Sequence, residues 1–200
     1  MEEKIDFLSE NYAIEGLLDC NSKDKGVVIT HPHPLYGGNM YNFVVESIVS
    51  AYEKKGYATL RFNFRGAGKS QGSFDNGQGE QTDVRSAIGY LCQKGIKDID
   101  LAGYSFGAWV NAQTNIKDMP VKNMVMVSPP VGFVNFDSIT SIIRLKLVIT
   151  GSRDEIAPVD LIKKMLPVWN QDAAFKVING ADHFYSAGSQ AIEDILSDYI

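Results

Sequence analysis

Short runs of apolar, mostly β-branched residues alternate along the chain with longer stretches of helical periodicity. Because two parallel strands need a crossover between them, usually a helix, this alternation predicts a mostly parallel, doubly wound α/β sheet with helices on both faces. Buried strands are expected at residues 27–30, 58–63, 99–104, 124–128, 147–150 and 175–178. Helices are expected at residues 43–55, 81–94, 108–114, 159–169 and 189–199.

The segment before this alternation has a different pattern. Residues 5–9 and 12–19 alternate as strands do on either side of Glu10-Asn11, which predicts an N-terminal antiparallel hairpin. The sheet would then have about eight strands. A chain of 200 residues without an internal repeat or polar linker fits one domain over residues 1–200. Ligands of such a domain bind beyond the carboxyl ends of the strands.

Charge narrows the classes of partner. The formal net charge of −5 argues against nucleic acid and anionic membranes, which attract clustered Lys and Arg, and favours a small-molecule partner. The first four residues (MEEK) lack the order of a secretory signal, and no apolar run approaches about 18 residues, so a cytoplasmic location is expected. The protein is expected to be a monomer or a homodimer. Cys20 and Cys92 fit free structural thiols, and no cofactor is expected.

The segment Gly103-Tyr104-Ser105-Phe106-Gly107 follows an expected strand and precedes an expected helix. A sharp turn there exposes the serine hydroxyl, and only small flanking residues let strand and helix approach so closely. The turn also aims the Phe106 N–H and the helix N-terminus at the position of a developing oxyanion. The G-x-S-x-G pattern arises by chance in glycine-rich turns, but this context predicts that Ser105 is a nucleophile.

A base for Ser105 is expected after the last strand, because triads built on this arrangement run in the order nucleophile, acid, histidine. His183, within residues 179–184 (NGADHF), is the only one of three histidines in that place. Its imidazole would take the Ser105 proton and return it to the leaving group. A surface loop histidine is the alternative.

The acid of the triad is expected after a late strand. Asp154 is favoured, because its G-x-x-D turn sends the carboxylate back over the sheet. Glu155 and Asp137 remain alternatives, although Asp137 follows an earlier strand. Asp182 is too close to His183 in sequence to be its natural orienting partner.

Residues 30–40 (THPHPLYGGNM) form the most unusual stretch of the chain. They follow the strand after which this arrangement places a second oxyanion N–H. The two prolines cannot donate, so His33 or Leu35 must supply that group, and His33 is favoured. The H-x-H pair is a weak metal signal without a third ligand at suitable spacing. His31 is expected to be structural, with its side chain bonded to nearby loop backbone.

Residues 65–70 (RGAGKS) look like the end of a phosphate-binding loop. The motif G-x-x-x-x-G-K-[ST] requires glycine where the chain has Asn63, and G-x-G-x-x-G requires glycine where it has Gln71. The following residues also break helices, whereas a phosphate loop opens one. We therefore expect a loop that borders the active site rather than a nucleotide site.

Together these segments resemble the α/β-hydrolase superfamily, and within it the compact, lid-less bacterial hydrolases related to dienelactone hydrolases and serine aminopeptidase-like proteins. The resemblance covers nearly the whole chain and rests on residues 31–32 with 37–42, residues 61–72, the Ser105 turn, residues 151–158 and residues 180–184. It implies Ser105 as nucleophile, Asp154 as acid and His183 as base. It also implies oxyanion donors at Phe106 and near His33. The His33-Pro34 unit departs from the family pattern and leaves the second donor open.

The expected chemistry is acyl transfer to water through an acyl-enzyme on Ser105. Residues 129–146 separate the two strands between which this fold commonly inserts a lid, which leaves room for a loop and a short helix but no cap domain. The open site favours short acyl esters or small polar substrates, as in a carboxylesterase. Although aromatic residues at such positions are often simply core, those that could line an acyl pocket are Tyr36, Phe106, Trp109, Phe133, Phe136 and Phe184.

Other functions share parts of this pattern. A peptidase or a thioesterase uses the same triad and is separated only by substrate profiling. A non-catalytic binding protein on the same fold usually lacks a triad member, whereas this chain has all three candidates. Nucleotide binding is disfavoured by the incomplete glycine patterns.

Overall fold

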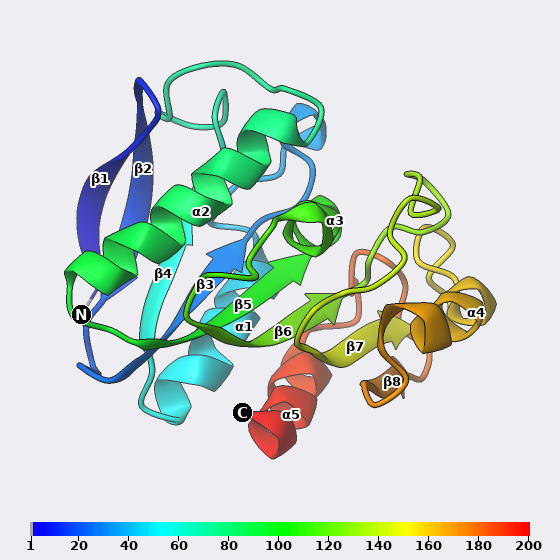
Figure 1. Cartoon of the computed structure of the whole chain (residues 1–200). Helices are drawn as coiled ribbons and strands as arrows, with labels where there is room; N and C mark the ends of the chain where they lie inside the picture. The colour runs from blue at the N-terminus through cyan, green and yellow to red at the C-terminus, as the bar shows by residue number, and fades with distance from the viewer. Residues whose placement is uncertain (1) are drawn as a thin grey trace.

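The computed structural model describes residues 2–200, which contain one eight-stranded sheet with helices on both faces (Figure 1). Its strands are β1 (Glu3–Ser9), β2 (Tyr12–Asp19), β3 (Lys25–Thr30), β4 (Ala58–Phe62), β5 (Asp98–Tyr104), β6 (Val121–Val127), β7 (Leu145–Gly151) and β8 (Ala174–Ile178). Their order is β1-β2-β4-β3-β5-β6-β7-β8. The β1–β2 and β2–β4 pairs are antiparallel and the others parallel, which confirms the predicted mostly parallel sheet with an N-terminal hairpin.

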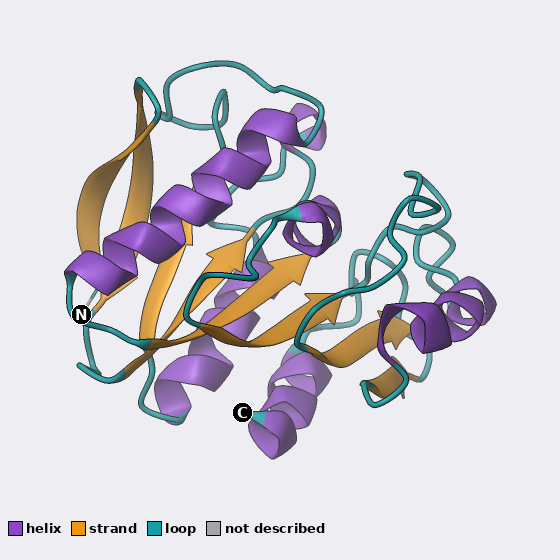
Figure 2. Ribbon diagram, in the orientation of Figure 1, coloured by secondary structure: helices purple, strands orange, loops and turns teal. Residues whose placement is uncertain are grey.

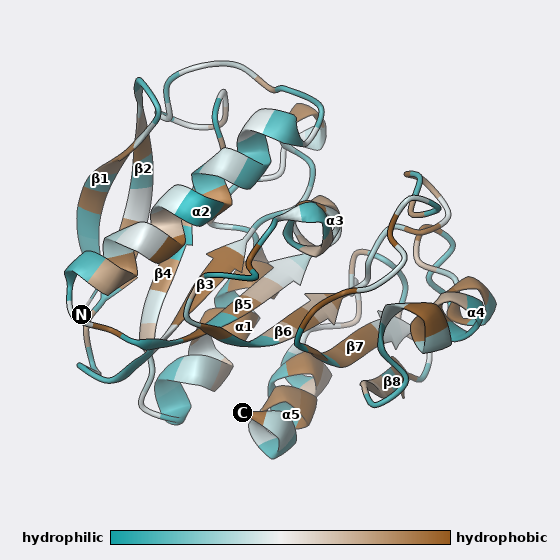
Figure 3. Cartoon of the chain, in the orientation of Figure 1, coloured by the Kyte–Doolittle hydropathy of each residue, from teal (hydrophilic) through white to brown (hydrophobic). Residues whose placement is uncertain are grey.

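Helices cover the two faces of the sheet unequally (Figure 2). Within residues 2–200 they are α1 (Phe43–Lys54), α2 (Gln78–Gln93), α3 (Phe106–Gln113), α4 (Val159–Asn170) and α5 (Gln190–Tyr199), with a 3₁₀ turn at Pro34–Tyr36. α1 and α5 pack on one face, with Ile48 and Leu196 in its core, and α2, α3 and α4 pack on the other, with Ile88 and Ile162 in its core. Figure 3 shows hydrophobic colouring along the central strands between these layers.

Two helices begin earlier than their apolar patterns indicate. α2 begins at Gln78 because the Glu80 carboxylate accepts hydrogen bonds from the N–H groups of Gly77 (2.8 Å) and Asp75 (2.9 Å), which satisfies otherwise free donors at the helix start. α3 begins at Phe106, immediately after Ser105. The N-terminus of α3 therefore lies directly at the candidate nucleophile.

β8 differs from the buried strand that the sequence predicts. It lies at the edge of the sheet and pairs only with β7, and its residues Lys176 and Val177 are exposed. An edge strand has a neighbour on one side only, so part of it remains in water.

The connection between β6 and β7 is short and irregular. Residues 128–144 form turns and loops without the short helix for which the sequence leaves room. No cap therefore covers the carboxyl edge of the sheet at this point. No helix of residues 2–200 has both the length and the apolar character needed to cross a membrane.

Candidate active site

Ser105 lies in the sharp turn between β5 and α3. Its backbone has φ 53° and ψ −119°, and such a conformation costs a non-glycine residue about 1–3 kcal/mol. Close packing requires the flanking glycines, because a Cβ at either Gly103 or Gly107 would lie 2.6 Å from Thr30 Oγ1. The Ser105 N–H donates to the Val127 carbonyl of β6 (2.9 Å), which holds the turn against the sheet.

Three side chains distant in sequence meet at the carboxyl edge of the sheet. Ser105 Oγ lies 2.9 Å from His183 Nε2, and His183 Nδ1 lies 2.9 and 3.0 Å from the two carboxylate oxygens of Asp154. All three residues are almost completely buried. Because an ionised carboxylate can only accept, Nδ1 carries the hydrogen that points to it, which leaves Nε2 free to accept from the Ser105 hydroxyl.

The Asp154 carboxylate is buried yet strongly supported. Burial alone would raise its pKa, but hydrogen bonds to it outweigh burial and leave the pKa below its ordinary value. The donors are the His183 ring, the Ala157 N–H (2.6 Å), the Ile156 N–H (3.0 Å) and the Thr150 hydroxyl (3.4 Å). Asp154 therefore stays ionised while it faces the imidazole.

The other acidic candidates point elsewhere. Glu155 and Asp137 are exposed, and neither forms a hydrogen bond or ion pair with His183. Asp182 accepts hydrogen bonds from the N–H (2.9 Å) and the hydroxyl (2.7 Å) of Ser186. Of the acids considered, Asp154 is the one that contacts the histidine.

Two backbone N–H groups are available beside Ser105. Phe106 and His33 both line the pocket that contains Ser105, and within residues 2–200 neither N–H donates a hydrogen bond. The Leu35 N–H, in contrast, donates to Nδ1 of the His33 ring (3.3 Å). Of the two residues that the sequence left open, His33 is thus the one whose N–H is free for a ligand.

His31 is structural, as expected. Its completely buried ring contacts the Pro32 carbonyl through Nδ1 (2.6 Å) and accepts the Phe64 N–H at Nε2 (3.0 Å). Burial, opposed by the Pro32 hydrogen bond and aided by nearby His33, lowers the pKa of His31 to about 4. Both ring nitrogens are occupied, and residues 2–200 hold no group of three His, Cys, Asp or Glu side chains suited to a metal ion.

A pocket of about 430 Å³ opens at Ser105. Three of the aromatic residues proposed to line it, Tyr36, Phe133 and Phe184, do line it and are largely exposed. The ring centroids of Tyr36 and Phe133 are 6.0 Å apart. These three side chains, together called the aromatic rim, give the pocket an apolar mouth.

Trp109 and Phe136 are absent from the lining of this pocket, contrary to expectation. The Trp109 ring packs against Phe106 (5.5 Å between centroids), and its Nε1–H donates to the Asn135 carbonyl (3.0 Å). Phe136 is buried and packs against Trp169 of α4 (5.2 Å). Phe136 is thus a core residue and Trp109 is partly buried against the core, whereas Phe106 lines the pocket.

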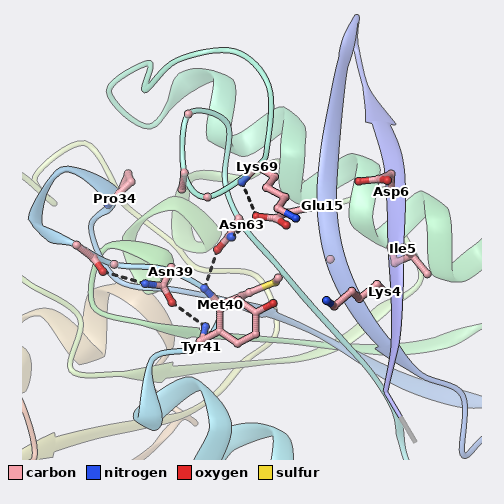
Figure 4. A pocket seen from close by; sticks show the side chains of 16 residues that line it. Lys4, Ile5, Asp6, Glu15, Pro34, Asn39, Met40, Tyr41, Asn63 and Lys69 are labelled. Carbon is pink, nitrogen blue, oxygen red and sulfur yellow. Dashed lines mark hydrogen bonds between the residues drawn. The ribbon is translucent and has the colours of Figure 1, made fainter.

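A second cavity, of about 610 Å³, lies between the β1–β2 hairpin and residues 34–41 (Figure 4). Residues 66–69 line this cavity, and none of residues 65–70 lines the Ser105 pocket. The glycine-rich loop therefore borders the second cavity and not the active site, because its turns fold back toward the hairpin, where Gln71 N–H donates to the Ala13 carbonyl (2.9 Å).

Polar groups at this second cavity already bind one another. Asn63 accepts from the Met40 N–H and donates to Glu15, both at 2.7 Å, and Glu15 also accepts from the Lys69 N–H (Figure 4). This network joins the hairpin to the loops after β3 and β4.

Comparison with known proteins places the chain in a family. No family model matches the sequence. It is 34% identical over 183 residues to an uncharacterised protein of Rickettsia prowazekii, covering 86% of this chain and 77% of that protein. It is 33% identical to an α/β serine hydrolase homologue of Coxiella burnetii, with a TM-score of 0.88 and coverage of 98% and 96%. The chain belongs to the α/β serine hydrolases.

A lid-less member of the α/β serine hydrolases from Xanthomonas campestris is also similar, at 27% identity and a TM-score of 0.89, with 98% of this chain and 92% of that chain covered. The short β6–β7 connection agrees with this likeness. The present α/β serine hydrolase is thus a lid-less member of its fold.

Sequence reasoning did not identify two buried tyrosines of this serine hydrolase, Tyr104 and Tyr185, whose hydroxyl groups bond to His183 and to Ser128. Tyr104 OH donates to the His183 carbonyl (2.8 Å), and Tyr185 OH lies 2.8 Å from Ser128 Oγ. Burial raises the pKa of both tyrosines well above its ordinary value, so both remain protonated. The only sequence signal is their position, one residue before Ser105 and two after His183.

Proposed function

We propose that this protein hydrolyses small carboxylic esters through an acyl-enzyme on Ser105. The observation that carries the proposal is the unbroken hydrogen-bonded series from Asp154 through His183 to Ser105, at an open pocket of a serine hydrolase fold. Such a series activates a hydroxyl whose own pKa is far too high for it to ionise alone.

In the first half-reaction Ser105 Oγ attacks the ester carbonyl carbon and its proton passes to His183 Nε2. The imidazolium then gives this proton to the leaving alkoxide, which departs as an alcohol. In the second half-reaction water attacks the acyl-enzyme, His183 takes a proton from the water, and the acid leaves as Ser105 regains its hydrogen. Asp154 holds the ring and stabilises its positive charge in both halves.

The tetrahedral oxyanion would be held by the N–H groups of Phe106 and His33. Phe106 is the first residue of α3, so the helix dipole adds to its attraction for negative charge. Neither N–H group has another partner among residues 2–200, so no hydrogen bond has to break before they bind the oxyanion.

Loss of the Ser105 hydroxyl tests the proposal directly. Ser105→Ala should abolish labelling by a fluorophosphonate probe and hydrolysis of p-nitrophenyl acetate, whereas Ser73→Ala, at an exposed loop serine, should leave both unchanged. Equal labelling of wild type and Ser105→Ala would disprove Ser105 as the nucleophile.

Short acyl chains should be preferred, because the pocket is small and no cap exists to cover a long chain. The kcat/KM for p-nitrophenyl acetate should exceed that for the palmitate. Faster turnover of the palmitate would overturn this substrate assignment while leaving the nucleophile in place.

A further inference from the structure

The wall of the Ser105 pocket is built without charged side chains. The residues of the described range 2–200 that line it include no Lys, Arg, Asp or Glu. Burial lowers the pKa of His33, so its ring at this wall is neutral at neutral pH. A carboxylate or an ammonium group placed inside would lose hydration without meeting an opposite charge, which is strongly unfavourable. The pocket therefore suits an uncharged substrate.

Asn42 brings a free hydrogen-bond donor to this wall. It is the half-buried N-cap of α1, and its Oδ1 accepts the Val44 N–H at 3.0 Å. Only the oxygen of an amide can accept, so this bond fixes which end of the side chain is nitrogen. Nδ2, with its two hydrogens, then faces away from the first turn of α1. Within residues 2–200 it forms no hydrogen bond and is not enclosed, so a ligand can reach it.

The other polar side chains inside the pocket already have partners. Ser105 and His183 bond one another, and Tyr104 OH donates to the His183 carbonyl (2.8 Å). The His33 ring accepts the Leu35 N–H at Nδ1 and packs against three aromatic rings. The amide nitrogen of the α1 cap is thus a donor that the protein itself leaves unused.

We propose that Asn42 is a specificity-determining residue that selects uncharged esters with a second oxygen acceptor, an ether or carbonyl oxygen, on the acyl or the alcohol arm. This inference rests on the proposed function, because the donor acts on an ester held at Ser105. Asn42 Nδ2 donates to that oxygen while the aromatic rim packs against hydrocarbon. An ester with a methylene in its place displaces water from the amide without replacing the lost hydrogen bond, which lowers kcat/KM.

Asn42→Asp separates the donor from the cap. A carboxylate accepts the Val44 N–H as an amide oxygen does and is an equally good N-cap, so α1 keeps its first turn. The variant loses both Nδ2 hydrogens. Asn39→Asp is the matched control, because Asn39 Oδ1 likewise accepts a backbone N–H, that of Tyr41 (2.9 Å), and Asn39 does not line the Ser105 pocket. It makes the same change of charge three positions away.

Two pairs of esters test the two arms, and each pair differs only by oxygen in place of methylene. They are p-nitrophenyl methoxyacetate with p-nitrophenyl butyrate, and 2-methoxyethyl acetate with butyl acetate. Relative to alkaline hydrolysis, the wild type should favour the ether of at least one pair about five- to tenfold in kcat/KM. Asn42→Asp should lose this preference and Asn39→Asp should keep it. Each readout is a ratio within one protein, so a general change of activity cancels.

Two results would refute the role of Asn42: a wild type without preference in either pair, or a preference that survives in Asn42→Asp. Thermal unfolding of both variants checks that the comparison is made between folded proteins.

A binding measurement separates this inference from the proposed function. Ser105→Ala removes the proposed nucleophile, so that protein should hold the esters without consuming them. The side-chain amide resonance of Asn42, identified by its absence from Asn42→Asp, should shift with an ether ester and much less with its methylene counterpart. A resonance that stays in place while the wild type hydrolyses esters contradicts the role of Asn42 alone. A wild type without fluorophosphonate labelling or ester hydrolysis contradicts the proposed function, and the resonance still decides whether Asn42 binds the acceptor.

Discussion

The loops after β3 and after β8 each place a buried histidine near the carboxyl edge of the sheet, but the two rings have different kinds of partner. The ring nitrogens of His31 contact only backbone groups, the Pro32 carbonyl and the Phe64 N–H. His183 contacts only side chains through its ring nitrogens, those of Ser105 and Asp154.

Under the proposed function, this difference separates a structural histidine from a reactive one. Backbone amides neither gain nor lose protons at ordinary pH, so a ring held by them stays in one protonation state. A hydroxyl and a carboxylate can take part in proton transfer, so the ring between them can shuttle a proton. In the proposed mechanism the loop after β3 then contributes a backbone N–H, and the loop after β8 contributes a side chain.

The largest expected effect follows from removing each ring in turn. His183→Ala should lower kcat by about 10⁴-fold or more, with an unfolding midpoint close to that of wild type. His31→Ala should lower the free energy of unfolding by about 2–3 kcal/mol, because the Phe64 N–H loses its partner, while kcat per folded molecule stays within about tenfold. Urea unfolding and active-site titration measure both, and equal losses of kcat would erase the distinction.

The pH dependence of stability should reveal His31. Its pKa is lowered from 6.5 to about 4, chiefly by burial. Above pH 6.5 the ring is neutral in both states. Between pH 6.5 and 4 the unfolded chain binds a proton that the folded chain excludes, so the free energy of unfolding falls as pH falls, by roughly 3 kcal/mol. His31→Gln should flatten this interval in urea titrations, and an unchanged slope would contradict the assignment.

The backbone contribution of the loop after β3 can be isolated with proline. His33 has φ −58°, which proline adopts without strain, so His33→Pro removes the N–H, and His33→Ala serves as the control for the lost ring. His33→Pro should lower kcat about 10²-fold relative to His33→Ala. Leu35→Pro should change kcat only a few-fold. The reverse order would assign the oxyanion donor to Leu35.

The smallest expected effect concerns a feature that the two loops share. Tyr36 from the loop after β3 and Phe184 from the loop after β8 both belong to the aromatic rim. Tyr36→Ala and Phe184→Ala should each raise KM about three- to tenfold with little change in kcat, because a partly exposed ring contributes about 1 kcal/mol of uniform binding. Steady-state kinetics with p-nitrophenyl butyrate would measure this. A loss confined to kcat would instead indicate that the aromatic rim contacts the substrate only in the transition state.

Local pattern was sufficient to predict most of the fold. Each of the eight strands and five helices forms where apolar runs or helical periodicity indicated, with ends moved by a few residues. The Ser105 turn was predictable because its glycines are forced by contacts with the adjoining strand. Asp154 and His183 could be placed because they follow β7 and β8, and chain order determines which strand ends lie together.

Contacts between remote segments were not predictable. Nothing near Tyr185 in sequence indicates that its hydroxyl reaches Ser128, 57 positions away, nor does the sequence near Ser128 indicate a left-handed backbone. Trp109 was misplaced because a position on a short helix does not tell which way the ring turns. The glycine-rich loop was misplaced because its partners, among them Glu15, belong to the hairpin.

The backbone at Ser105 bears on how such a chain changes over generations. Glycine would adopt φ 53° without penalty, so the simplest substitution that relaxes this turn is also one that deletes the hydroxyl. Selection for stability alone would therefore favour glycine at position 105, which keeps the fold and removes the proposed nucleophile. Under the proposed function, turnover is what offsets the conformational cost of a serine at this position.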